Sequence, residues 1–156
     1  MRLLVLSDSH GDTFTLRKAI MQNSSADAVI FLGDGIHDWE YVTESPTNKT
    51  LIAVRGNCDF YANRYPLKAI EEFDGVRVYC THGHSETVKY STDMLKEKTR
   101  ECGATIALYG HTHTAKSEYD DGLYIMNPGS VRDNSCGIVD ITPKGIICYT
   151  KPIVTN

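Results

Sequence analysis

The chain consists largely of short apolar runs, and five of them stop at a residue that can bind a metal ion. The runs cover residues 3–7, 28–33, 51–56, 76–81 and 105–110, and the residues that follow them are Asp8, Asp34, Asn57, His82 and His111. Apolar runs of this length, bounded by Gly and polar residues, are typical of buried β-strands. Because ligands gather just outside the carboxyl ends of strands in an open parallel sheet, we expect these side chains to meet at one edge, together with His10 and His113.

Between the first three runs the pattern changes to helical spacing. A helix is expected to begin near Asp12 or Thr13, either of which can cap it. Its buried side is expected to consist of Leu16, Ala19, Ile20 and Asn23. A weaker helix is expected at residues 36–43. This alternation of strand and helix favours a mainly parallel sheet with right-handed crossovers in this half of the chain.

The middle of the chain predicts a loop, a hairpin and a surface helix. Residues 55–66 are rich in Asn, Asp, Tyr and Pro, which is typical of an irregular loop, and a strand is expected at residues 67–73. Asp74-Gly75 predicts a two-residue hairpin into the strand that ends before His82. Charges alternate in sign over residues 86–102, which predicts an amphipathic surface helix. Its apolar side is formed by Val88, Met94, Leu95 and Cys102.

After residue 105 the helical spacing disappears and only short strands are predicted. They cover residues 115–119, 123–126, 137–141 and 146–151, with turns at residues 120–122 and 143–145. This pattern favours antiparallel pairing in the second half of the chain. No linker or repeat interrupts it, so we expect a single α/β domain over residues 1–156 with two stacked mixed β-sheets flanked by helices.

The composition is that of an ordinary globular protein. The 156 residues are 41% hydrophobic and 23% charged, which fits one domain with a sizeable core. A net charge of −4 argues against nucleic acid as a partner, because non-specific binding to nucleic acid rests on Lys and Arg. No run is long enough for a signal-peptide core or a membrane span, and the five cysteines form no C-x-x-C pair. We therefore expect an unexported, cytoplasmic protein with reduced thiols and no membrane partner.

The residue types at the strand ends indicate which metals they could hold. Carboxylate, imidazole and amide groups suit Mn, Fe, Zn, Co or Ni, whereas the all-oxygen sites of Ca²⁺ and Mg²⁺ rarely include so many histidines. Seven candidates are too many for one ordinary tetrahedral site. Two ions with a bridging carboxylate would use them all, and ions ~3.5–4 Å apart clamp the attacking and leaving oxygens of a displacement at phosphorus.

Several short motifs occur in an order that resembles a known enzyme family. They are Asp8-Ser9-His10, Gly33-Asp34, Gly56-Asn57-Cys58-Asp59, Thr81-His82-Gly83-His84 and Gly110-His111-Thr112-His113. Their order resembles that of the calcineurin-like metallophosphoesterases. Asn127-Pro128-Gly129-Ser130 makes the chain most similar to the small phosphodiesterases of the YfcE type. The resemblance runs from Met1 to about Lys151 and implies a four-layer αββα sandwich and a phosphoric diester hydrolase.

The resemblance also implies roles for individual residues. One metal ion is expected to be held by Asp8, His10 and His113, and the other by Asn57, His82 and His111. Asp34 is expected to bridge them. Mn²⁺ is the first expectation for both ions, with Fe, Zn, Ni or Co as alternatives. A water or hydroxide between the ions would be the nucleophile, because coordination lowers its pKa towards ~7.

Cys58 departs from the family pattern. Many members have His at this position, where it can protonate the leaving oxygen, whereas a neutral thiol is poorly matched to that task. Proton transfer by a well-placed side chain is worth ~10²–10⁴ in rate. We therefore expect a bias towards substrates whose leaving group departs without help, such as aryl phosphodiesters.

Other residues near the motifs allow more than one interpretation. Asn57 could also contact the substrate, and His84 could touch its phosphate, orient His82 or be an ordinary loop residue. Cys58 is better explained as a small packed side chain, with at most a weak substrate contact, than as a nucleophile. His37 is expected at the surface. Residues 127–130 are expected to form a strand-to-turn element whose backbone shapes the floor of the site.

Four aromatic residues follow the second and third strands and are therefore expected at the same edge as the ligands. They are Trp39, Tyr41, Tyr61 and Tyr65. These rings could stack on an aryl or nucleobase part of a substrate. Packing of the loops or of a subunit contact is the preferred interpretation.

Three functions compete. The leading one is a metal-dependent phosphodiesterase that acts on a small or activated phosphodiester. A nuclease would share the order of the motifs, but the chain has no basic stripe. A protein-interaction scaffold like the phosphoesterase-fold subunit of the retromer complex would share the fold, but that subunit lacks part of the ligand set that is intact here. A homo-oligomer is compatible with the family by analogy alone.

Overall fold

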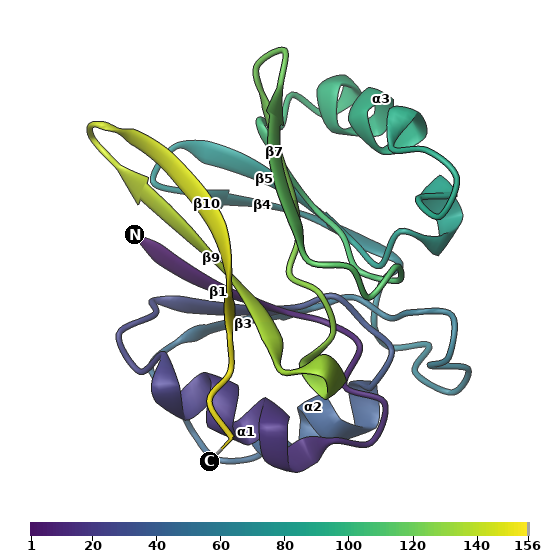
Figure 1. The fold of residues 1–156 in the computed structure, drawn as a ribbon, viewed down its shortest axis with the longest axis vertical. Coiled ribbons are helices and arrows are strands. Elements are labelled where there is room, and N and C mark those ends of the chain that lie inside the picture. Colours follow the sequence, from purple (N-terminus) through teal and green to yellow (C-terminus); the bar gives the residue numbers. More distant parts are fainter. Residues whose placement is uncertain (156) are drawn as a thin grey trace.

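Two five-stranded β-sheets form the centre of the molecule (Figure 1). The computed structural model describes residues 1–155. The first sheet has the order β10 (Gly145–Pro152), β9 (Ser135–Thr142), β1 (Arg2–Leu6), β2 (Ala28–Phe31) and β3 (Thr50–Ala53). The second sheet has the order β4 (Lys68–Phe73), β5 (Val76–Thr81), β6 (Ile106–Leu108), β8 (Leu123–Asn127) and β7 (Lys116–Asp120).

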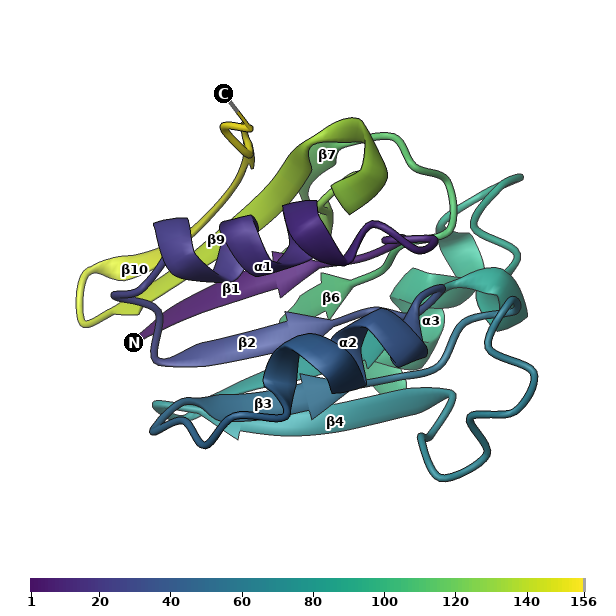
Figure 2. The same cartoon turned by 90° about the horizontal axis from the view of Figure 1, so that it is seen from below.

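Helices cover the outer face of each sheet, so the fold has four layers. The first sheet is covered by α1 (Thr13–Gln22) and α2 (Ile36–Thr43), as Figure 2 shows, and the second by α3 (Asp93–Glu101). Successive residues of β1 point to opposite faces. Leu3 and Val5 therefore join the core between the sheets, whereas Leu4 and Leu6 pack under the helices. The expected αββα sandwich is confirmed.

The pairing of strands in the second sheet differs from the expectation. β1, β2 and β3 are parallel, as the pattern predicts. β5 and β6 are also parallel, as expected for two runs that end at the same edge, and β7 and β8 are antiparallel, as the pattern predicts. β6 and β8 are parallel, although antiparallel pairing is expected there. The chain crosses from β5 to β6 through α3, and β8 then enters the sheet between β6 and β7. Short apolar runs specify that strands form but not which strands become neighbours, so the pattern did not predict the pairing of β6 with β8.

The helix expected over residues 86–102 is shorter than predicted. A 3₁₀ turn, η1 (His84–Glu86), comes first, and Thr87 then has a φ of +53°, which ends helical geometry until α3 begins. Glu86 is 2% exposed and accepts hydrogen bonds from the Tyr79 hydroxyl at 3.0 Å and the Lys98 ammonium at 3.1 Å. The buried Tyr79 and the half-buried Lys98 hold Glu86 in the core, although its charge suggested a solvated face. No helix within residues 1–155 has the length and apolar character needed to cross a bilayer.

Candidate metal centre

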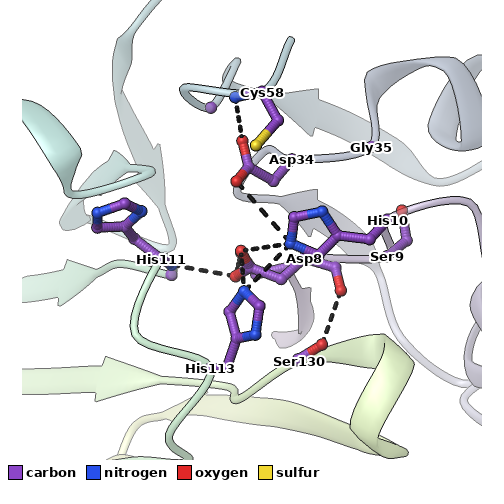
Figure 3. A network of polar contacts seen from close by, with 12 residues as sticks. Asp8, Ser9, His10, Asp34, Gly35, Cys58, His111, His113 and Ser130 are labelled. Carbon is purple, nitrogen blue, oxygen red and sulfur yellow. Dashed lines mark hydrogen bonds and ion pairs between the residues drawn. The ribbon is translucent and has the colours of Figure 1, made fainter.

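The seven side chains predicted as metal ligands lie together at the carboxyl ends of strands from both sheets (Figure 3 labels five of them). Three groups place their ligand atoms within 4.8 Å of one another. The groups are Asp8, His10 and His113; Asp34, His82 and His111; and His10, Asp34 and Cys58. Asn57 joins the second group, because its Oδ1 lies 3.1 Å from His82 Nε2.

Asp8 keeps one carboxylate oxygen free for a ligand. Its Oδ2 accepts hydrogen bonds from the Ser7 hydroxyl at 2.6 Å and the His111 amide at 3.0 Å. Its Oδ1 is buried and accepts no hydrogen bond from the residues that the structure describes. This oxygen lies 3.1 Å from His113 Nε2 and 3.6 Å from His10 Nε2. A buried carboxylate oxygen without a partner is costly unless a cation or water satisfies it.

Asp34 lies between the two groups of candidate ligands. Its Oδ1 accepts a hydrogen bond from the Cys58 amide at 2.7 Å. Its Oδ2 lies 3.3 Å from His82 Nε2 and 3.9 Å from His10 Nε2. This carboxylate can therefore reach both groups at once.

The backbone fixes the orientation of His82. Its Nδ1 lies 2.7 Å from the carbonyl oxygen of Leu32, which can only accept, so Nδ1 carries the proton of the neutral ring. The lone pair of Nε2 then faces the oxygens of Asp34 and Asn57. A lone pair directed at two oxygens is stable only with a proton or a cation between them. Metal-binding histidines commonly have such a second hydrogen bond.

Five of the seven side chains stand on backbone with positive φ. The values lie between 44° and 68° and belong to Asp8, His10, Asp34, His111 and His113. Left-handed backbone costs an L-residue about 1–2 kcal/mol. Strain of this kind persists where the surrounding structure enforces it, and it gathers at functional sites.

Close backbone packing behind the ligands requires glycine. A Cβ added to Gly56 would lie 2.1 Å from Asp34 Oδ1, and a Cβ added to Gly33 would lie 2.4 Å from the Gly56 nitrogen. Gly33 also has a φ of +93°. The two glycines let the loops after β2 and β3 touch, which brings Asp34 and Asn57 together.

Asp59 organises these loops, although the sequence reasoning gave it no role. Its carboxylate accepts four backbone N–H groups, at 2.7–3.0 Å. The donors are Asp34, Gly35, Ile36 and Gly56. No side chain of the preceding loop caps α2, so Asp59 supplies the cap from the next loop. Its position within the Gly56-Asn57-Cys58-Asp59 motif was the one feature of the sequence that could have indicated this role.

Residues 127–130 support the site mainly through side chains. The Asn127 amide donates to the Gly110 carbonyl at 2.8 Å and to the Thr112 hydroxyl at 2.9 Å, which holds the loop of His111 and His113. The Ser130 hydroxyl donates to the Asp8 carbonyl at 2.8 Å. The strand-to-turn element thus lies where it is expected, and its side chains hold the loops of the ligands in addition. That its backbone shapes the floor of the site stays a prediction.

Comparison with known proteins now identifies the family. Residues 1–142 match the calcineurin-like phosphoesterase superfamily domain. The chain belongs to this family. It is 32% identical over 133 residues to YsnB of Bacillus subtilis, a probable metallophosphoesterase, which covers 85% of this chain and 76% of the relative. It is 26% identical over 153 residues to the phosphodiesterase YfcE of Escherichia coli strain K12, which covers 84% of this chain and 79% of the relative.

A solved structure shows the same architecture. Vps29 of Chaetomium thermophilum superposes with a TM-score of 0.78 at 16% identity, over 99% of this chain and 98% of the other. At this identity the likeness shows the fold alone. The family match and the named relatives confirm the expectation of an enzyme, a phosphoric diester hydrolase of the metallophosphoesterase class.

The electrostatics of this phosphoesterase site keep Asp34 ionised and His111 neutral, and they favour a positive charge beside His82. Burial alone would raise the pKa of Asp34, but the hydrogen bond and charge of His82 outweigh burial and hold that pKa well below its usual range. Burial alone would lower the pKa of His82, but the neighbouring Asp34 and Asp8 raise it. Burial, and then the charge of His82, lower the pKa of His111 to about 4. An ionised carboxylate and a neutral imidazole are ligand forms, and a cation could replace the proton on His82.

His84 lies beside the phosphoesterase centre, and His37 lies at the surface as expected. The His84 ring centroid is 5.5 Å from that of His82 and 6.2 Å from that of His111. Its Nδ1 is buried and has no hydrogen-bond partner among residues 1–155. Burial, and then the charge of His82, lower the pKa of His84, so the ring stays neutral.

The four aromatic residues that follow β2 and β3 in this phosphoesterase differ in their surroundings, and Trp39 and Tyr41 belong to α2. Trp39 is 3% exposed and stacks on Phe31, with ring centroids 5.5 Å apart, and Tyr65 packs partly buried against the same cluster. Tyr41 is exposed and its ring lies under the Arg17 guanidinium. Tyr61 is 99% exposed. Packing is therefore confirmed for Trp39 and Tyr65, whereas Tyr61 packs against nothing within residues 1–155, and a subunit contact of its ring stays a prediction.

Proposed function

We propose that this phosphoesterase is a phosphodiesterase whose centre holds two divalent transition-metal ions within a single domain. The observation that carries the proposal is the place of Asp34, whose Oδ2 is within 3.9 Å of nitrogens from both ligand groups. A bridging carboxylate of a two-metal site requires such a place. One ion would be held by Asp8, His10, His113 and Asp34, and the other by Asn57, His82, His111 and Asp34.

The donor atoms fit such ions. The buried Oδ1 of Asp8 has no hydrogen bond from residues 1–155, and Nε2 of His82 faces two oxygens. A cation beside Asp8 would pair its free oxygen, and a cation beside His82 would separate the nitrogen lone pair from the two oxygens that repel it. Mixed nitrogen and oxygen ligands suit Mn²⁺, which we expect first, or Fe, Zn, Ni or Co.

When bound, such ions supply Lewis acidity that polarises phosphoryl oxygens and lowers the pKa of water. The chain itself supplies position and charge. Desolvation and the neighbouring Asp34 carboxylate raise the pKa of the Cys58 thiol to about 11, so the thiol is neutral at pH 7 and acts neither as nucleophile nor as an efficient acid. Asn57 and His84, with a weaker contact from Cys58, are proposed to touch the substrate phosphate. The substrate is proposed to be a small or activated phosphodiester in the cytoplasm.

A metal-dependence assay tests this function. Metal content would be measured by mass spectrometry, and hydrolysis of bis(p-nitrophenyl) phosphate would be measured before chelation, after chelation and after addition of Mn²⁺. We expect chelation to abolish hydrolysis and Mn²⁺ to restore it. Asp34→Asn should lower kcat/KM by at least about 10²-fold and reduce bound metal.

The matched control is Asp133→Asn, which changes an exposed carboxylate of η2 (Val131–Asp133) and should leave activity and metal content unchanged. Hydrolysis that survives complete chelation would contradict the metal-dependent mechanism. A protein that binds metal but hydrolyses no phosphodiester would favour the interaction scaffold, whose fold Vps29 shares. Activity on DNA that falls steeply with salt would favour the nuclease.

A further inference from the structure

A cavity of about 530 Å³ lies directly beside the candidate metal centre. It opens between residues 58–64 and the beginning of α2, and its volume is within the range of about 300–1,000 Å³ that is typical of small-molecule sites. Cys58 borders both the cavity and the candidate metal centre. It lines the cavity, while its amide hydrogen-bonds to Asp34 and its sulfur lies within 4.8 Å of ligand atoms of Asp34 and His10. Figure 3 shows Cys58 on the side of Asp34 that is away from His113.

Three planar rings line this cavity: His37, Phe60 and Tyr61. Phe60 is 76% exposed and Tyr61 is 99% exposed, so neither ring contributes much to the core. Aromatic faces offer stacking contacts to another planar group. Two almost free aromatic rings beside a catalytic centre therefore provide a surface that a planar ligand can cover.

The backbone of the loop that carries Phe60 and Tyr61 is anchored to the metal centre. Phe60 directly follows Asp59, whose carboxylate accepts the Asp34 amide at 2.8 Å and the Gly56 amide at 2.7 Å. The loop then turns through a hydrogen bond from the Ala62 amide to the Asp59 carbonyl at 3.1 Å. A loop whose backbone is ordered before binding loses less conformational entropy when a ligand binds.

The charges of the cavity favour an uncharged occupant. Arg64 is the one Lys or Arg among the residues that line it, and its guanidinium forms an ion pair with Glu40 and lies over the Tyr65 ring. The cavity therefore presents no unpaired cation for a second anionic group. An uncharged planar group does not need such a cation.

We propose that this cavity, named here the aryl cavity, binds the ester substituent that stays on phosphorus when the leaving group departs, and that this substituent is planar and uncharged, either an aryl ring or a nucleobase. The inference rests on the proposed function, because the metal centre must hold the phosphoryl group. A phosphate bound at Asp34 would place one ester substituent past Cys58, and Tyr61 would stack on its planar part.

Three diesters with the same leaving group test this proposal. Each contains p-nitrophenol, and the second ester group is methyl, phenyl or thymidin-5′-yl. In the Mn²⁺-loaded enzyme, Tyr61→Ala should lower kcat/KM about tenfold for a planar ester, as expected when one stacking contact is lost, and less than about twofold for the methyl ester. A loss confined to the phenyl ester identifies an aryl ligand, and a loss confined to the thymidinyl ester identifies a nucleobase. A loss for both esters shows that the cavity binds planar uncharged groups of either kind.

The control variant is Tyr119→Ala, which removes an exposed tyrosine of β7 that does not line the cavity and should leave the selectivity unchanged. Equal losses on all three diesters, or no loss on the planar esters, would overturn the proposal. A change of oligomeric state in Tyr61→Ala with intact selectivity would also overturn it, because the rings would then form a contact between copies.

Failure of the proposed function is recognised separately. If the native enzyme hydrolyses none of the three diesters, binding of phenyl phosphate and thymidine 5′-monophosphate is measured by calorimetry. Affinity at least about fivefold weaker in Tyr61→Ala would still support the aryl cavity. Equal affinity in the two proteins would overturn it.

Discussion

At the scale of single residues, we expect Cys58 to determine which leaving groups this phosphoesterase can serve. Its amide supports Asp34, so the position is close enough to the centre for a proton donor. Its thiol has a pKa of about 11, because desolvation and Asp34 both disfavour the thiolate. A thiol with this pKa transfers a proton poorly near pH 7, whereas an imidazole is well matched.

Cys58→His should widen the range of substrates. We expect kcat/KM of the native enzyme to fall steeply as the pKa of the leaving group rises, and a flatter dependence in Cys58→His. The gain for the poorest leaving group should be about 10²-fold or more. A series of phosphodiesters with increasing leaving-group pKa measures both slopes. Cys58→Ser is the matched control, and its kcat/KM should still fall steeply as the leaving-group pKa rises. A kcat/KM that stays constant across the series in the native enzyme would refute the expectation.

At the scale of elements, Asp59 connects α2 to the two loops that present Asp34 and Asn57. One carboxylate satisfies four N–H groups, two on each oxygen. An amide has only one accepting oxygen, and its NH₂ group would face the remaining donors. The capping of α2 and the position of the centre therefore depend on the same charge.

Asp59→Asn should lower the free energy of unfolding by about 2–3 kcal/mol, because hydrogen bonds to a charged group are lost and N–H donors stay unpaired. Urea denaturation measures the change. Asp133→Asn, an exposed aspartate, serves as the control and should differ from the native protein by less than about 0.5 kcal/mol. An equally small change in Asp59→Asn would contradict the role given to this residue.

The pairing of β1 with β9 includes an ion pair that should respond to pH. Arg2 donates to Asp140 from Nε at 2.7 Å and from Nη2 at 2.9 Å, and these hydrogen bonds lower the pKa of Asp140. The folded pKa is thus below the unfolded value of about 3.9, so the stabilisation is complete above that pH and is lost as the pH falls through the folded pKa.

Asp140→Asn should therefore cost about 0.5–1 kcal/mol at pH 7, the scale of a partly exposed ion pair, and progressively less below pH ~3.9. Urea denaturation of both proteins at pH 7 and at pH 3 measures the difference. A difference that grows on acidification would show that the sign is wrong.

At the scale of the whole molecule, the centre joins the two sheets. The His111 amide, after β6 of the second sheet, donates to Asp8, after β1 of the first sheet. His82, after β5, meets the Leu32 carbonyl, after β2. A cation at this junction would bind the folded chain and not the unfolded one, so it would stabilise the stacking of the sheets.

Addition of Mn²⁺ at about 100 times its dissociation constant should raise the free energy of unfolding by about 2.7 kcal/mol. For a chain of this size that corresponds to an increase in Tm of roughly 5–10 °C. Differential scanning calorimetry with and without Mn²⁺ measures it. Asp34→Asn should lose most of the increase, and an equal increase in native and variant proteins would show that the ion binds elsewhere.

The sequence was informative where the location of a residue in the fold follows from its immediate neighbours in the chain. A polar residue after a buried strand lies at the carboxyl end of that strand, so the gathering of Asp8, Asp34 and His82 could be predicted. The roles of these residues as ligands stay predictions. Glu86 and Asp59 show where such reasoning ends. The partners of Glu86 belong to other elements, and those of Asp59 are backbone amides, which no side-chain pattern reveals.

The sequence by itself determined the strands, the first two helices, the family and the set of side chains at the centre, because apolar periodicity and the order of motifs can be read along the chain. Only the tertiary structure decided that β8 lies between β6 and β7, that Glu86 is buried and that Tyr61 is free beside a cavity. These features depend on which surfaces meet after the chain has folded. The free energy of such contacts belongs to pairs of residues far apart in the chain, and a linear pattern does not contain it.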